Sequence, residues 1–287
     1  DYTGGTISPT LVTGGGFGIL EAETSDSSTI GLIWQPGFAA LSLSVDYFDI
    51  TVRDEVDQLG GSVIINECYA SPFGFSSGNN EPLCQLFDRS SANFGIDNIN
   101  DSFINIAEQT NRGYDYAFRW DTELGSVGQL GVDIRATQRL EDTRALFAET
   151  AEDLNGTIGY PEWVGKYDFS YYRGNLSVNY GGNYVGDSDS TRLLPGDGTI
   201  QYFGETYDAV MYTDSVVYHN LSASYTWDSV GITALLGVAN FTNEKPPQVT
   251  TEGGTDAEID YVGNSVFYSQ YDWFGRRWYA NLTWSFN

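Results

Sequence analysis

Basic residues are scarce in this chain of 287 residues: thirteen lysines and arginines stand against thirty-nine acidic residues, giving a formal net charge of -26. Only two of the thirteen are lysines, Lys166 and Lys245. Nucleic-acid binding needs clustered Lys and Arg to neutralise phosphates, so this composition excludes DNA and RNA as partners. An acidic surface favours solubility and attracts cations, but it identifies no ligand.

Long apolar runs are also lacking. The longest candidate, VGITALLGVANF from Val230, falls short of the ~20 residues that a membrane-spanning helix needs. A helical membrane protein is therefore excluded, whereas a β-barrel is not, because a transmembrane strand needs only about ten alternating residues. The start, DYTGGTISPT, shows no signal peptide, and we expect a mature or truncated product.

Cysteine and histidine are nearly absent. Cys68 and Cys84 lie in a stretch rich in Gly, Ser, Asn and Pro, which predicts a loop closed by one disulfide and stabilised by roughly 3 kcal/mol. Two free thiols or a metal pair are the alternative, but CxxC spacing and nearby histidines are missing. The lone His219 shares a face with Val217 and Leu221, which favours packing over catalysis. Without a second histidine or a GxSxG motif, we predict no enzyme, no catalytic residue, no metal site and no cofactor.

Alternation of apolar and polar residues with a period of two recurs along the whole chain, while sustained helical spacing does not. Between positions 41 and 47 the odd-numbered residues are apolar, whereas Ser42, Ser44 and Asp46 occupy the even positions. The pattern predicts an all-β fold with antiparallel strands. Nine are expected, at 24–35, 39–52, 103–120, 128–140, 162–172, 175–186, 216–227, 230–241 and 276–287.

The predicted connections alternate between short and long. Short turns lie at QPG, DTELGS, RGN and DS, and long connections follow Val52, Leu140, Gly186 and Phe241. Outer-membrane barrels show this asymmetry, with short periplasmic turns and long extracellular loops. Because nine strands alone would leave unpaired edges in lipid, we expect the C-terminal portion of a longer transmembrane barrel. Residues 1–23 would then belong to an extracellular loop, and 24–287 to strands and loops.

Aromatic residues mark the ends of the predicted strands on the side of the short turns. Amphipathic rings favour the headgroup level, so such residues predict an aromatic girdle at the periplasmic interface, in contact with outer-membrane lipid. Tryptophan also favours strand ends in soluble sandwiches, which is the alternative explanation. The girdle residues are Trp34, Trp120, Tyr172, Trp227, Trp284 and Phe286.

Five segments, in order, resemble the C-terminal barrel portion of TonB-dependent outer-membrane receptors, in the proteobacterial group with a Cys-containing extracellular loop. They are LEAETSDSSTIGLIWQP, VDYFDITVRDEV, INIAEQTNRGYDYAFRW, LLGVANFTNEKPPQV and YDWFGRRWYANLTWSF. The fourth is similar to the family's N-L-F-N-x-x-P-P signature and the fifth to its terminal Y-D-x-x-G-R strand. Two departures are Ala22, where the family commonly has Pro, and Asn287 in place of a terminal aromatic residue.

The resemblance implies about nine strands of a roughly 22-stranded barrel that encloses a plug. It implies active uptake of a bulky nutrient, such as an oligosaccharide or a ferric siderophore, across the outer membrane of a Gram-negative bacterium. The TonB complex would supply energy through an N-terminal plug region that lies outside this segment. Two alternatives are a passive outer-membrane porin and a secreted carbohydrate-binding β-sandwich, which would bury the same apolar faces.

Aromatic residues in the long connections are the candidates for ligand contact, since rings can stack on a sugar or another flat group. Packing of one loop over another is the alternative. These candidates are Tyr69, Phe73, Phe75, Tyr202, Phe203 and Tyr207. Acidic pairs such as Asp187 with Asp189, or Asp256 with Glu258, could coordinate Ca²⁺, although solvated loop carboxylates explain them as well.

Overall fold

The computed structural model describes residues 10–13, 20–70, 82–90, 95–145, 151–193, 199–202, 205–250, 261–262, 265–266 and 270–285. Several residues named above lie outside these ranges: Phe73, Phe75, Phe203, Asp256, Glu258, Phe286 and Asn287. For Tyr202 only the backbone is described.

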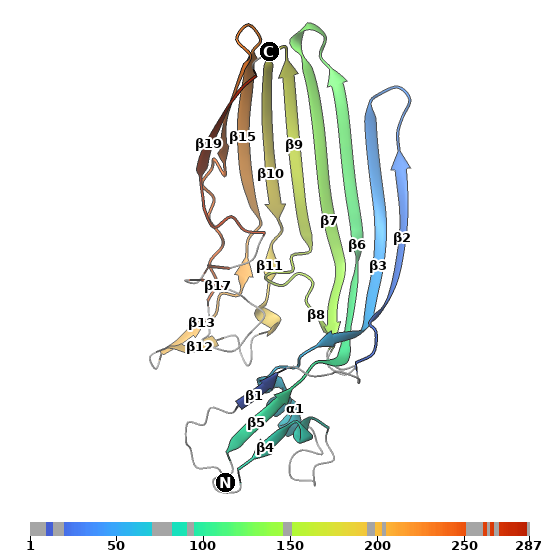
Figure 1. The fold of residues 1–287 in the computed structure, drawn as a ribbon, viewed down its shortest axis with the longest axis vertical. Coiled ribbons are helices and arrows are strands. Elements are labelled where there is room, and N and C mark those ends of the chain that lie inside the picture. Colours follow the sequence, from blue (N-terminus) through green and yellow to red (C-terminus); the bar gives the residue numbers. More distant parts are fainter. Residues whose placement is uncertain are drawn as a thin grey trace. The chain divides into compact units, whose positions relative to one another are not determined.

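One large sheet dominates the fold, with strands in the order β2-β3-β6-β7-β9-β10-β15-β16-β19 (Figure 1). From β7 to β19 every neighbouring pair is antiparallel. These nine strands confirm the predicted set and the all-β fold class. Their bounds are Thr24–Trp34, Leu41–Asp57, Ile104–Glu123, Gln129–Ala145, Trp163–Arg173, Leu176–Val185, Val216–Trp227, Ile232–Ala239 and Arg277–Trp284. A short strand, β8 (Glu152–Asp153), pairs with β7.

The four short turns lie at the same end of the sheet, the top in Figure 1. Between β9 and β10 the turn consists of Gly174 and Asn175, since Arg173 pairs directly with Leu176. Gly174 has φ +54°, a conformation that favours glycine because it carries no Cβ. The Asn175 side chain donates to the carbonyl of Thr226 at 2.7 Å, which ties this turn to the end of β15. Between β6 and β7 lies a 3-10 turn, η3 (Gly125–Val127).

Three strands are longer than the alternation predicts. β3 continues to Asp57, β6 to Glu123 and β7 to Ala145. Arg112 of β6 approaches Asp49 of β3 at 3.1 Å and Glu141 of β7 at 2.8 Å. In the added parts of β3 and β7 most side chains are charged or polar. The strands continue there, but the alternation of apolar and polar residues that would predict them is lost.

Backbone contacts divide the chain into two units. The first comprises residues 1–26, 51–110 and 144–152, and the second comprises 27–50, 111–143 and 153–287. The first unit contains a three-stranded sheet in the order β1-β5-β4, with β1 parallel to β5. Its elements are β1 (Thr10–Thr13), α1 (Gly61–Ala70), η2 (Pro82–Gln85), β4 (Phe87–Arg89) and β5 (Ile96–Asp101).

The first unit has its own apolar core. Leu59, Ile64, Phe87 and Ile99 are buried together with the two cysteines. The predicted long loop after Val52 is therefore a folded subdomain, and the predicted loop over residues 1–23 contributes β1 to it. Sequence patterns missed α1 because its apolar residues include the β-branched Val63, Ile64 and Ile65, which favour strands as much as helices.

The second unit carries small elements on the long connections. These are β11 (Ser188–Asp189), η5 (Thr191–Leu193), β12 (Thr199–Tyr202), β13 (Glu205–Asp208), β14 (Tyr212–Thr213), β17 (Tyr261–Val262) and β18 (Ser265–Val266). A buried cluster joins the loops to the sheet, with Val185, Val216 and Tyr218 from the strands and Met211 and Val266 from the loops. The loops are thus anchored on the end of the sheet opposite the short turns. No helix in the described ranges is long and apolar enough to cross a membrane.

Candidate functional site

One face of the large sheet is apolar and uncovered. The cross-strand register aligns Val178, Ala223, Leu236 and Ala280 in one row across β10, β15, β16 and β19. Leu236 is 56% exposed and Leu282, two residues beyond Ala280, is 70% exposed. A contiguous exposed apolar face on a barrel wall is the surface that meets lipid. We call this the outward face.

The predicted girdle residues that the structure describes lie at the short-turn end of the sheet. Trp227 and Trp284 both pair with Ile232, which places them in one row of the outward face. Trp34 ends β2 and Trp120 lies near the end of β6. Tyr172 is the exception, because it pairs with Ser177 and Gln129 on the opposite face. Its neighbour is on the outward face instead: Tyr171 pairs with Val178 and Leu130.

The opposite face, which we call the inward face, is polar. One of its rows reads Ser170, Asn179, Ser222, Gly237 and Tyr279. The inward-facing cations of β6, β7 and β9 each have a nearby carboxylate. The pairs are Arg119 with Asp121 at 2.9 Å, Arg135 with Asp133 at 2.9 Å, Arg139 with Asp142 at 3.8 Å and Lys166 with Asp168 at 3.4 Å. Asp115 of β6 adds further negative charge on this face, where its carboxylate accepts from the Thr137 hydroxyl at 2.6 Å.

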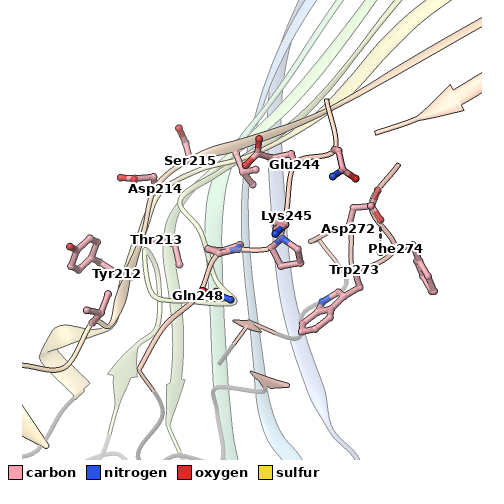
Figure 2. A pocket seen from close by; sticks show the side chains of 16 residues that line it. Tyr212, Thr213, Asp214, Ser215, Glu244, Lys245, Gln248, Asp272, Trp273 and Phe274 are labelled. Atoms are coloured by element: carbon pink, nitrogen blue, oxygen red, sulfur yellow. Dashed lines mark hydrogen bonds between the residues drawn. The ribbon is translucent and has the colours of Figure 1, made fainter. Parts of the chain in front are cut away.

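A cavity of about 770 Å³ lies among the connections at the long-loop end (Figure 2). Three segments line it: residues 210–216 before β15, 243–248 after β16 and 272–275 before β19. The lining mixes carboxylates with aromatic rings, including Asp214, Glu244, Tyr212 and Trp273, and one lysine, Lys245. Such a pocket suits a ligand that offers hydrogen-bond donors together with an apolar face.

Asn240 builds the wall that follows β16. It is fully buried and has φ +48°, a conformation that Asn tolerates better than most residues. Its side chain donates to the carbonyl of Glu244 at 2.8 Å and accepts from the Glu244 N–H at 2.8 Å. The Asn220 side chain accepts from the Asn240 N–H at 3.0 Å. The segment 240–244 is thereby closed into a fixed loop on the end of β15.

Asp272 holds the wall that precedes β19. Its carboxylate accepts from Arg277 at 2.6 Å and from the Phe274 N–H at 3.0 Å. Burial raises the pKa of Asp272, but the hydrogen bonds and the charge of Arg277 outweigh burial and hold the pKa below its usual value. Asn243 accepts from the Arg276 N–H at 3.0 Å, so the two walls are joined.

The disulfide between Cys68 and Cys84 is present, with an S–S distance of 2.04 Å, and it connects α1 to η2. Tyr69 follows the first cysteine and is 50% exposed. The Arg89 guanidinium lies 5.6 Å from the centre of the Tyr69 ring and 5.8 Å from that of Phe87. Of the other candidate ligand residues, Tyr207 is described on β13 and is 51% exposed. Tyr69 and Tyr207 belong to different units.

His219 packs among aromatic rings on the outward face. Its ring stacks on Tyr180 at a centroid distance of 5.9 Å, and Nδ1 lies 2.6 Å from the Tyr167 hydroxyl. Phe241 covers another side at 5.7 Å. The contacts of His219 are therefore those of a packed residue on the outward face.

The described residues contain no group of three or more His, Cys, Asp or Glu side chains that could hold a metal ion. Asp189, one of the acidic candidates, accepts from the Thr191 N–H at 2.8 Å. Hydrogen bonds from Thr191 lower the pKa of Asp189, so this carboxylate has a local structural role.

The residues that line the cavity were not among the predicted ligand contacts. The sequence does carry a signal for them, because Asn240, Asn243 and the Pro246-Pro247 pair are turn-forming residues at close spacing. What alternation does not show is that this turn meets the segment before β19, which lies far along the chain.

An uncovered apolar outer face, a polar inner face and short turns gathered at one end define the wall of an outer-membrane β-barrel. The model of the TonB dependent receptor-like β-barrel family matches residues 2–241, and the chain belongs to that family. Its members are outer-membrane proteins of Gram-negative bacteria and are transport receptors rather than enzymes. The large open sheet of this family fold leaves the β-sandwich alternative without support. No curated protein sequence matches the chain.

Solved structures show the same fold at low sequence identity. One is a G324V mutant of the ferric enterobactin receptor of Pseudomonas aeruginosa, which is 15% identical to this chain with a TM-score of 0.58. The match covers 93% of this chain and 32% of the receptor chain. The FrpB iron transporter of Neisseria meningitidis is 13% identical with a TM-score of 0.55, and the match covers 96% of this chain and 33% of FrpB. The siderophore receptor PirA of Acinetobacter baumannii is 15% identical with a TM-score of 0.52, covering 92% and 32%. The chain thus spans about a third of the length of these proteins.

Proposed function

We propose that this chain is the C-terminal part of the barrel of an outer-membrane transporter. The transporter would take up a bulky nutrient, with energy supplied through the TonB complex. The observation that carries the proposal is the family match over residues 2–241. The two-faced sheet supports it, because a wall that is apolar outside and polar inside can separate lipid from a polar passage. In this proposal, a plug region outside residues 1–287 would contact TonB.

Two ligand classes follow from the observations in hand. The structural neighbours are receptors for ferric enterobactin and other iron carriers, which favours a ferric siderophore. Exposed aromatic residues on the long connections, such as Tyr69 and Tyr207, favour an oligosaccharide. The acidic cavity at the long-loop end would receive the ligand from outside the cell.

The test is an uptake assay with the full-length protein that carries this chain, expressed in a Gram-negative host lacking its own receptors. Cells would receive radiolabelled maltohexaose or ⁵⁵Fe-enterobactin, with and without an intact TonB system. We expect accumulation of one probe that stops when TonB is deleted. Accumulation that persists without TonB, together with ion conductance in planar bilayers, would identify a passive porin instead.

A further inference from the structure

A second concave site lies on the inward face, away from the cavity at the long-loop end. It is a groove of about 220 Å³ across β9, β10, β15 and β19. The lining residues that matter here are Lys166, Asp168, Asn179, Asn183, Ser222 and Tyr279. The groove is built from strands rather than loops, so its shape is fixed by the sheet.

Glycines on the inward face leave room for the larger side chains around the groove. A Cβ at Gly181 would lie 2.6 Å from Asp168 Oδ1, and a Cβ at Gly237 would lie 2.2 Å from Tyr279 Cζ. The Tyr279 ring therefore reaches from β19 over the backbone of β16, toward Ser222 on β15. Since Tyr279 is 46% exposed, its ring remains accessible at the edge of the groove.

The groove has little net charge. Its only cation, Lys166, has its Nζ 3.4 Å from Asp168, and its other polar groups are amides and hydroxyls, notably Asn179, Asn183 and Ser222. The neighbouring inward-facing arginines, Arg119, Arg135 and Arg139, have carboxylates of their own. A polyanionic ligand in the groove would therefore meet one lysine that is already paired with a carboxylate, and no second lining cation.

Amide and hydroxyl side chains both donate and accept hydrogen bonds, which matches a ligand whose groups also do both. An exposed tyrosine ring adds a surface for an apolar face made of C–H groups. These two properties occur together in a sugar ring. Resting on the proposed transport function, we propose that this groove is a subsite for one unit of a neutral oligosaccharide on its way through the barrel. It selects against polyanionic ligands.

The test is isothermal titration calorimetry with the purified full-length receptor in detergent, which needs no TonB. The uncharged probes are maltohexaose, cellohexaose and xylohexaose, and the anionic probe is ferric enterobactin. Tyr279→Ala removes the ring, and Ser222→Tyr fills the groove from a different strand. The matched control is Asn281→Ala, at the next inward-facing position of β19, outside the groove.

We expect at least one uncharged probe to bind, with tenfold or weaker affinity in Tyr279→Ala and Ser222→Tyr and unchanged affinity in Asn281→Ala. Equal affinity in the wild type and all three variants would contradict the proposal that the groove is a binding subsite. Binding of ferric enterobactin alone, or of no probe, would overturn the neutral-oligosaccharide assignment. Neither result bears on the proposed transport function, because the TonB-dependent uptake assay tests that function separately.

Discussion

At the scale of single residues, the long-loop end depends on a buried amide. Asn240 closes the turn after β16 with two side-chain hydrogen bonds to the Glu244 backbone, and its own backbone is at φ +48°. Few residue types meet both demands. Glycine tolerates the backbone and lacks the amide, whereas alanine lacks the amide and is strained at positive φ.

The first prediction is that Asn240→Ala lowers the free energy of unfolding by about 2–4 kcal/mol, combining lost hydrogen bonds with backbone strain. Asn240→Gly removes only the hydrogen bonds, so its cost should be smaller. The midpoint of guanidinium-induced unfolding in lipid vesicles measures both. Asn281→Ala, on the exposed strand β19, is the control and should change the midpoint little. Equal costs for the alanine and glycine variants would show that φ is not strained.

The second prediction concerns Asp272, whose pKa is held below the ordinary 3.8 by hydrogen bonds and by Arg277 despite burial. A carboxyl group with a depressed folded-state pKa contributes stability above its unfolded-state pKa and loses it as pH falls through the folded-state value. The stability difference between wild type and Asp272→Asn should therefore be constant from pH 7 to about 5 and shrink below pH 3.8. Asp214→Asn, in the same cavity, is the control. A difference that persists at pH 2.5 would contradict the assigned role.

At the scale of elements, the disulfide determines the stability of the subdomain that contains α1. Cys68 and Cys84 lie in its core, and the loop between them spans a sequence separation of 16. Removing such a cross-link costs roughly 3 kcal/mol by the chain-entropy estimate.

The third prediction is that Cys68→Ser combined with Cys84→Ser raises hydrogen exchange throughout α1, η2, β4 and β5. Exchange in β9 and β10 should stay unchanged, because these strands belong to the other unit. Mass spectrometry of peptic peptides measures hydrogen exchange in the subdomain and in β9 and β10 in one experiment. Treating the wild-type receptor with a reductant should reproduce the pattern. Equal deprotection of β9 and β10 would show instead that the whole barrel depends on the disulfide.

The large sheet was predictable from sequence because one physical rule, alternation between lipid and a polar interior, acts on every strand. The predicted strands end too early where the alternation ends, because β3 and β7 continue past Val52 and Leu140 with mostly polar residues. The face on which a strand's last residue lies can be assigned only when the cross-strand register is known. Without the register, Tyr172 was grouped with the tryptophans, although it is Tyr171 that lies on the outward face. The cavity was missed because its walls meet only in the folded chain.

At the scale of the whole molecule, the two faces of the large sheet differ in charge. The inward face pairs its cations with carboxylates, while the outward rows such as Val178, Ala223 and Leu236 are uncharged. Charge is thereby kept out of lipid, where an arginine or lysine costs about 2–4 kcal/mol at mid-depth and an acidic side chain costs less. A net charge of -26 is compatible with a membrane protein for this reason.

The last prediction tests where lipid meets this wall. In a full-length receptor with the chain's tryptophans replaced by Phe, we would introduce Tyr171→Trp or Tyr172→Trp, adjacent residues on opposite faces of β9. In vesicles of brominated lipid, Trp at 171 should be quenched strongly and Trp at 172 weakly, because only the first contacts acyl chains. Restoring Trp227 or Trp284 singly should give quenching typical of the headgroup level, since both rings lie in one row at the short-turn end. Equal quenching at 171 and 172 would contradict the assignment of the outward face, and quenching of the two native tryptophans by aqueous iodide alone would contradict the girdle.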